Sequence, residues 1–288
     1  MTSIDTTAPK LRRRRRSYSH AARVGGAIFI SLLFLFPVFW MVLTSFKSQV
    51  DIFTTPPKLF FDATWATYIE YFTRADIPDR LLNTVIVATG AGILSIVVGT
   101  LSGYALARIR LRGAATFGVL ILMSRGVPPI ALAVPMFLVA RNMGLTDKHI
   151  TLIFAYCTFL IPYVMWLMRS FFVSLPKELE ESAMIDGCSR FGAFFKIIVP
   201  ISMPGILSTL IFSIILAWEE LLFALVLTSR DAVTIPVAIA GIAGDTETGA
   251  NWAALTAVGT VTVIPVVIFA LLVQKWLIQG LADGATKG

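Results

Sequence analysis

The chain has 288 residues, of which 57% are hydrophobic and only 14% are charged, whereas about a quarter of the residues in a soluble domain are charged. This composition excludes an ordinary soluble domain and indicates a polytopic, all-α membrane protein. The formal net charge of +7 does not indicate a nucleic-acid-binding protein, because Arg12–Arg16 lie in a polar tail without interleaved aromatic residues. Two histidines and two cysteines are too few for a metal cluster or a disulfide framework.

The chain begins with a polar, basic segment over residues 1–22, which we predict to be a mobile cytoplasmic tail, followed by a transmembrane domain over residues 23–288. The run Val24–Phe46 is long enough to span a membrane, since about 20 apolar residues cross the hydrocarbon core. A signal peptide is the alternative, but the run is too long and no small-residue cleavage site follows it. We predict an outer loop, lying partly at the membrane interface, over residues 47–79.

Five further apolar runs follow, so the sequence predicts six transmembrane helices. Their approximate bounds are Leu81–Ala107, Ala114–Ala140, Ile150–Met168, Gly205–Thr228 and Trp252–Val273. Arg125 and the pair Pro128-Pro129 interrupt the second of these runs, which is the third predicted span. Most of the 24 Lys and Arg residues lie in the N-terminal tail and in the loops on its side. The positive-inside rule therefore places both termini and residues 174–200 in the cytoplasm.

Residues 174–200 form a charged segment between apolar runs and are predicted to fold as two short helices. Ser174 is a candidate N-cap for the first helix, and Gly187 can supply the left-handed residue that ends it. Ser189 is a candidate N-cap for the second helix, which Pro200 is predicted to close. An ordered, polar pair of helices at the cytoplasmic face indicates a docking element.

The spacing within this segment resembles the EAA motif of ABC-importer permeases, which reads EAA, three residues, G, nine residues, I, one residue, LP. Here the motif starts at Glu181-Ser182-Ala183 and continues with Gly187, Ile197 and Val199-Pro200. Ser182, Cys188 and Val199 depart from the common residues by small changes in size. Other stretches are similar to maltose-type carbohydrate permeases, so that the resemblance covers nearly the whole chain. These stretches are Leu43–Lys47, Pro128-Pro129, Ala217-Trp218 and Gly280–Gly288.

The resemblance implies a type I ABC-importer permease in the inner (plasma) membrane. It also implies three partners: a cytoplasmic ABC ATPase dimer, a second permease subunit of different sequence, and an extracytoplasmic solute-binding protein. The chain has no Gly-rich Lys-Ser/Thr phosphate loop. ATP and Mg²⁺ are thus expected on the partner ATPase, and neither catalytic activity nor a cofactor or metal is expected in this chain.

The predicted ATPase-coupling residues are Glu180, Glu181, Ser182, Ala183, Met184, Ile185, Asp186, Gly187 and Cys188. We expect the carboxylates of Glu180, Glu181 and Asp186 to accept hydrogen bonds from basic groups of the partner, and the apolar members to add contact area. The alternative is that the acidic residues only keep a loop soluble. A helix pair turned at Gly187 could transmit closure of the ATPase as a rigid-body movement.

Four residues within the spans are candidates for the solute path: Arg125, Trp218, Glu219 and Glu220. Charges at membrane depth are costly and usually face protein or water. From the helical rise, Arg125 lies about 16 Å and Glu219 about 21 Å from the cytoplasmic ends of their spans. We hypothesise that Arg125 pairs with one of the two glutamates, either along the path or as a purely structural ion pair. Trp218 would stack on a sugar face or pack between helices.

The sequence thus predicts the permease subunit of an ATP-driven, binding-protein-dependent sugar importer. A polyol or glycerophosphodiester importer is the alternative within this class. A proton-coupled secondary transporter would use the intramembrane charges but would not need the docking motif. An intramembrane enzyme is disfavoured, because the spans contain no recognisable catalytic set.

Overall fold

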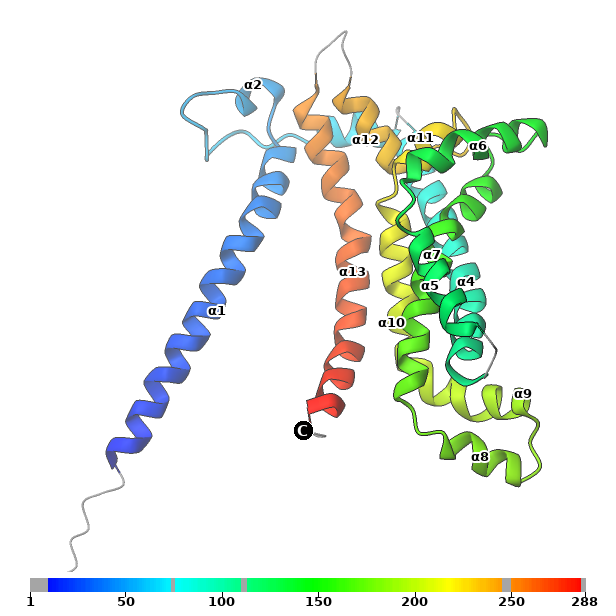
Figure 1. Ribbon diagram of the computed structural model, residues 1–288. Coiled ribbons are helices and arrows are strands. Elements are labelled where there is room, and N and C mark those ends of the chain that lie inside the picture. The colour runs from blue at the N-terminus through cyan, green and yellow to red at the C-terminus, as the bar shows by residue number, and fades with distance from the viewer. Residues whose placement is uncertain (1–9, 74–75, 110–112, 245–249, 286–288) are drawn as a thin grey trace, which may run out of the picture.

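A computed structural model describes residues 10–73, 76–109, 113–244 and 250–285 (Figure 1). Within these ranges every regular element is a helix, as the all-α prediction requires. The helices are α1 (Lys10–Ser45), α2 (Gln49–Ile52), α3 (Ala66–Thr73), α4 (Ile77–Arg108), α5 (Ala114–Ser124), α6 (Pro129–Asn142), α7 (His149–Ser174), α8 (Glu178–Ile185), α9 (Arg190–Ala193), the π-helical turn η1 (Phe194–Ile198), α10 (Val199–Trp218), α11 (Leu222–Leu227), α12 (Ile235–Ala243) and α13 (Trp252–Ala285).

Five stretches of helix are long and apolar enough to cross a membrane, and α5 with α6 makes a sixth if the bent pair counts as one span. The five are Ala22–Ser45, Ile77–Arg108, His149–Ser174, Arg190–Trp218 and Trp252–Leu272. The six predicted spans are therefore confirmed in their places along the chain. Residues 10–22 of the predicted tail have a helical backbone and form the start of α1. Residues 1–9 of that tail lie outside the described residues.

The third span is broken more sharply than predicted. α5 ends at Ser124, α6 begins at Pro129, and the two axes differ by 84°. Pro129 occupies the first turn of α6, where its missing N–H leaves no hydrogen bond unmade. The two prolines prevent α5 from continuing, because each removes a donor and clashes with the preceding turn. Arg125 follows the last residue of α5 and so lies directly at this break.

The fifth span also differs from the prediction, because it is not one helix over Gly205–Thr228. α10 ends at Trp218, and the separate helix α11 starts at Leu222. On the other side, the helix does not stop at Pro200 but runs from α9 through η1 into α10. The N–H of Val199 bonds to the carbonyl of Phe194, five residues back. This π-turn widens the helix just ahead of Pro200, so the helix passes the proline without breaking.

The centre of the bundle is the contact between α4 and α7. A Cβ at Gly99 would lie 2.6 Å from Cγ1 of Val164, and one at Gly103 would lie 2.8 Å from the carbonyl oxygen of Met165. The two helices thus approach so closely that only glycine fits, as predicted from the glycines of the second span. α10 packs against both helices.

α1 behaves differently from the other long helices. It contacts α13 near its own C-terminal end, where Sδ of Met41 lies 3.3 Å from the position of a Cβ at Gly259. Towards its N-terminus it diverges from the bundle (Figure 1). None of its most apolar window is buried within the chain. This helix therefore leaves a long apolar surface without cover from its own subunit.

Candidate functional site

The segment α8–Gly187–α9 projects from the end of the bundle at which the described part of α13 also ends (Figure 1). Gly187 has a φ of 88°, in the left-handed region, and ends α8 as predicted. The Ser189 hydroxyl accepts a 3.1 Å hydrogen bond from the N–H of Gly192, which confirms the predicted N-cap of α9. Of the four residues predicted to begin or end a helix in this segment, Gly187 and Ser189 are thus confirmed, whereas Ser174 and Pro200 are not.

The predicted N-cap at Ser174 is wrong. Ser174 is the last residue of α7, and its hydroxyl donates to the carbonyl of Phe171 at 2.7 Å. The helix continues this far because Phe172 is fully buried against the bundle. It breaks only at Leu175, which adopts an extended conformation, as the residue before a proline usually does. α8 then starts after Lys177.

α8 has one face towards the bundle and one face towards solvent. Glu180 and Ala183, three residues apart, are buried with 7% and 5% of their surface exposed. Ile185 lies on the outer face and is 85% exposed. The remaining candidates divide as follows: Glu181, Ser182, Asp186 and Gly187 are exposed, and Met184 and Cys188 are half-buried. Seven of the nine predicted coupling residues are thus at least partly accessible.

Glu180 is not available to a partner, contrary to the prediction. Its carboxylate accepts a 2.7 Å hydrogen bond from Nε of Arg108 and a 3.0 Å hydrogen bond from the hydroxyl of Tyr104. Arg108 also donates to the carbonyl of Leu175, in the linker between α7 and α8, at 2.9 Å. The Arg108–Glu180 pair is the one buried ion pair in the part of the chain that the structure describes. The reason for the difference is register, because adjacent residues of a helix point about 100° apart, so that Glu180 and Glu181 lie on different faces of α8.

An aromatic cluster lies beneath this ion pair. The ring of Tyr104 lies 4.3 Å from that of Phe194 and 5.7 Å from that of Phe172, measured between ring centres. These three rings come from α4, η1 and α7. Tyr104 therefore links Glu180 to the packed core at the α8 end of the bundle.

A polar recess of about 360 Å³ opens beside the same ion pair. Its walls carry basic, acidic and one apolar side chain: Arg108, Lys177, Arg190, Glu180, Glu181 and Met184. The base of α8 consequently borders a polar recess rather than a continuous apolar core. Side-chain hydrogen bonds must then contribute much of the connection between α8 and α4.

Arg125 does not form the predicted ion pair with a glutamate. Its guanidinium lies over the ring of Tyr163 on α7, 5.2 Å from the ring centre. No salt bridge joins it to Glu219 or Glu220, all three of which belong to the described residues. The side chain is exposed on the surface of this chain. The break between α5 and α6 turns Arg125 towards α7, which an estimate based on depth alone could not show.

The two glutamates at the end of α10 have different environments. The Glu220 carboxylate accepts hydrogen bonds from the N–H groups of Phe223, at 3.0 Å, and Ala224, at 3.3 Å. It therefore caps α11, because these donors lie in the unsatisfied first turn of that helix. Glu219 is exposed. Of the two carboxylates, Glu219 is the one that a solute could reach.

Trp218 is a core residue. It is 3% exposed and packs in a cluster with Ala217 and Phe223. Its indole N–H has no hydrogen-bond partner in the structure. The packing interpretation therefore holds, and the ring is not available for stacking on a sugar.

A polar connection that was not predicted from the sequence lies at the end of the bundle opposite α8. The carboxylate of Asp147 accepts hydrogen bonds of 2.9–3.1 Å from the N–H groups of four consecutive residues, 229–232. Partial burial acts to raise the pKa of Asp147, but these four donors outweigh it and hold the pKa well below its usual range. Asn83, on α4, donates to the carbonyls of Asp231 and Val233 in the same loop. Gly144, with a φ of 67°, marks the turn, but no local signal identifies the partner loop.

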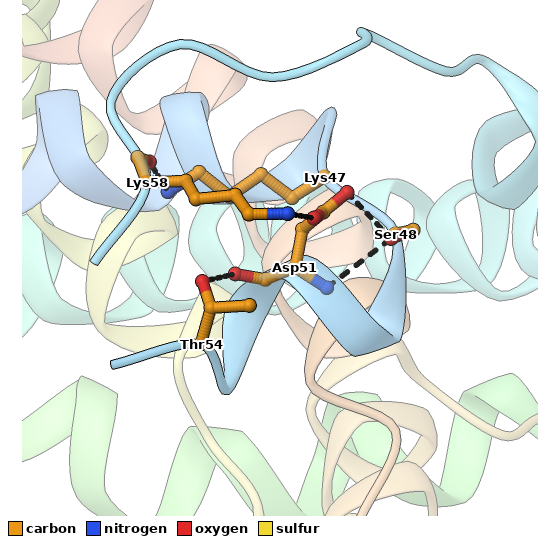
Figure 2. Close-up of polar contacts among 5 residues, drawn as sticks. All are labelled: Lys47, Ser48, Asp51, Thr54 and Lys58. Carbon is orange, nitrogen blue, oxygen red and sulfur yellow. Dashed lines mark hydrogen bonds and ion pairs between the residues drawn. The ribbon is translucent and has the colours of Figure 1, made fainter. Parts of the chain in front are cut away.

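The loop after α1 is held by its own charges (Figure 2). Lys47 is buried and donates to the carbonyl of Lys58 at 2.7 Å. Lys58 in turn forms a 2.6 Å ion pair with Asp51. The hydrogen bond from Lys58, followed by one from Ser48, lowers the pKa of Asp51. The stretch Leu43–Lys47, noted for its resemblance to carbohydrate permeases, thus ends in a lysine that fixes the loop.

Residues 95–283 match the family described as binding-protein-dependent transport system inner membrane component. A probable ABC transporter permease protein of Sinorhizobium fredii is 37% identical over 258 residues, which cover 90% of this chain and 92% of that protein. The trehalose/maltose transport system permease protein MalG of Thermococcus litoralis is 33% identical over 269 residues, covering 91% of this chain and 95% of that protein.

A solved structure has the same fold. It is a bacterial ABC transporter involved in the import of the acidic polysaccharide alginate, matched with a TM-score of 0.72. The match covers 95% of this chain and 99% of the other, at 23% sequence identity. This likeness agrees with the predicted fold of an ABC-importer permease.

Proposed function

Because the chain belongs to the family of binding-protein-dependent transport system inner membrane components, we propose that it is the permease subunit of an ATP-driven carbohydrate importer. A relative that is similar over nearly its whole length is a trehalose/maltose permease. The chain is a multi-pass inner-membrane protein. ATP and Mg²⁺ are bound by a partner ATPase, and this subunit carries the path for the solute.

The observation that carries the proposal is the exposed face of α8 and α9. Ile185 is 85% exposed and Phe191 is 69% exposed, and Glu181 and Asp186 are exposed beside them. Large apolar side chains gathered at a projecting element mark a contact site for another protein. The carboxylates would accept hydrogen bonds from basic groups of the ATPase, and the apolar side chains would fill its surface groove.

The proposed orientation has α8, α9 and both termini in the cytoplasm. The N-terminal end of α1 and the described end of α13 lie at the same end of the molecule as α8 (Figure 1). Together with the distribution of Lys and Arg, this arrangement supports the proposed topology. The loops fixed by Asp147 and Lys47 then face the solute-binding protein.

A second permease subunit, of different sequence, completes the proposed importer. The uncovered apolar window of α1 supports this part of the proposal, because such a helix can pack on a neighbouring subunit. Within this chain, exposed Arg125 and Glu219 are the proposed contacts to the solute path. Each charge lies at a break in a span, where irregular backbone is tolerated if it lines a cavity.

Reconstitution into proteoliposomes tests the proposal. The chain is combined with its ATPase, its second permease and its binding protein, and uptake of tritiated trehalose, maltose and diacetylchitobiose is measured. We expect uptake to require ATP inside the vesicles and to survive dissipation of the proton gradient. Glu181→Gln combined with Ile185→Asp should abolish binding of the ATPase, whereas Glu178→Gln, on the same helix, should not. Uptake that needs the proton gradient instead of ATP would establish a secondary transporter.

The solute class is tested on the binding protein. A thermal-shift screen against sugars, polyols and glycerophosphodiesters should show stabilisation by a sugar, since a ligand that binds only the folded state raises the midpoint. Stabilisation by polyols or glycerophosphodiesters alone would replace the carbohydrate assignment and leave the ATP-driven mechanism in place.

A further inference from the structure

The two adjacent glutamates of α8 face different surroundings. Glu181 faces solvent, whereas Glu180 faces the bundle and binds Arg108 and Tyr104 of α4. We propose that the Arg108–Glu180–Tyr104 cluster is the tether that transmits movement of the docked segment to the membrane helices. This inference rests on the proposed function, and it assigns a positioning role to three residues that do not touch the ATPase.

A tether is needed because the corner that joins α7 to α8 is not helical. Leu175 is extended and Pro176 follows it, so helical hydrogen bonding is interrupted between the two helices. A force on α8 could therefore be absorbed by rotation about this corner. Arg108 prevents that rotation, because its guanidinium donates both to Glu180 in α8 and to the carbonyl of Leu175 in the corner itself.

The end of the tether that lies on α4, at Tyr104, is held rigidly by packing. Tyr104 packs its ring against Phe194 and Phe172, which ties α4 to η1 and α7. Gly103, the residue directly before Tyr104 on α4, allows the backbones of α4 and α7 to touch. A displacement of Glu180 must consequently move α4 and α7 together, since packed elements shift as bodies rather than deform.

The recess beside the Arg108–Glu180 pair explains why the link between α8 and α4 depends on an ion pair. The root of α8 borders a polar recess of about 360 Å³ and not a continuous apolar core. On this side α8 has the ion pair with Arg108 in place of apolar packing, while its other contacts are with α9 and η1. Both charged side chains are at least nine-tenths buried, with 4% and 9% of their surface exposed, so water screens their interaction weakly.

The test compares sugar accumulated with ATP hydrolysed in the reconstituted complex, with the same three tritiated sugars as probes. In Arg108→Gln we expect ATP hydrolysis to stay within about twofold of wild type, while sugar accumulated per ATP falls roughly tenfold, a common factor for coupled sites. Tyr104→Phe keeps the ring and removes one hydrogen bond, so the ratio should fall by about twofold to threefold. The exchange Arg108→Glu with Glu180→Arg should restore part of the loss.

The controls separate this inference from the proposed function. Wild type that shows no ATP-driven uptake contradicts the proposed function, whatever the variants do. Glu178→Gln, exposed on the same helix, should leave the ratio unchanged. An assembled Arg108→Gln complex with a wild-type ratio would overturn the tether, as would a proportional loss of uptake and hydrolysis, which is the sign of a merely structural role. Should Arg108→Gln fail to assemble, Tyr104→Phe decides by the same criterion.

Discussion

Arg108, the last residue of α4, and Glu180, in the first turn of α8, meet at 2.7 Å although 72 positions separate them in the sequence. Both side chains are buried. The pair adds a direct link between α8 and α4, because α8 is otherwise connected through the chain at Leu175–Lys177 and through its neighbours α9 and η1. One ion pair thus fixes how the proposed docking segment is presented.

Removing one member of this pair should destabilise the protein strongly. Glu180→Ala leaves the Arg108 guanidinium buried without its charge partner, which is expected to lower the free energy of unfolding by about 3–5 kcal/mol. Denaturant unfolding of the purified chain in detergent measures this change. Glu178→Ala is the matched control, since Glu178 is exposed on the same helix and should change stability by less than about 0.5 kcal/mol. Equal effects of the two substitutions would show that the pair contributes nothing.

Substitutions of Gly187 should separate insertion from coupling. Gly187→Ala has open space for its methyl group but must adopt a φ of 88°, which destabilises a residue with a side chain by about 1–2 kcal/mol. Gly187→Pro cannot adopt that angle, because the ring holds φ near −65°. We expect both variants to insert, with a partial loss of ATP-driven uptake for alanine and complete loss for proline.

The control for this series is Gly241→Ala, because Gly241 lies within α12, with no atom within 4 Å of an added Cβ. Uptake should be unchanged in that variant. ATP-driven uptake by Gly187→Pro at the wild-type rate would contradict the role of the α8–α9 corner.

Local signals predicted the parts of the site that depend on local geometry. The left-handed Gly187 and the N-cap at Ser189 follow from neighbouring residues alone, and both are confirmed. Glu180 and Glu181 look alike in the sequence, but the register of α8 against α4 buries one and exposes the other. The spacing of Glu180 and Ala183 could have indicated a shared inner face. The partner Arg108 could not be inferred, because it depends on how distant helices pack.

The contacts of the charged residues within the spans could likewise not be predicted from local sequence. Depth along each helix predicted that Arg125 and the glutamates could meet, but it contained no information about the direction of the side chains. The 84° break after α5 and the start of α11 at Leu222 redirect these groups to Tyr163 and to backbone N–H donors. Prolines predicted the break, whereas the angle results from packing.

The stability of the loops that meet at Asp147 should depend on the charge of its carboxylate. Asp147→Asn keeps the shape of the side chain but replaces an ionised acceptor of four backbone N–H groups by an amide. We expect a loss of about 1 kcal/mol at neutral pH, at the lower end for charged hydrogen bonds because the carboxylate is partly exposed. Thermal unfolding in detergent measures it, with Asp231→Asn as control, since Asp231 is exposed in the same loop.

The pH dependence of this effect has a definite sign. The folded state lowers the pKa of Asp147, so the ionised carboxylate contributes stability above the unfolded-state value of about 3.9. That contribution is lost as the pH falls through the depressed folded-state pKa. The difference between wild type and Asp147→Asn should therefore be constant from about pH 5 to pH 8 and shrink below about pH 4. A difference that grows on acidification would contradict the assignment.

A double-mutant cycle decides whether Arg125 interacts with Glu220 in the protein. Arg125 lies over Tyr163, and Glu220 caps α11, so the two side chains have different partners. The effects of Arg125→Gln and Glu220→Gln on the free energy of unfolding should add to within about 0.5 kcal/mol. The matched cycle of Arg125→Gln with Tyr163→Leu should give a coupling of about 0.5–1 kcal/mol, as expected for a cation over an aromatic ring. A coupling above about 1 kcal/mol between Arg125 and Glu220 would instead support the ion pair that depth alone suggested.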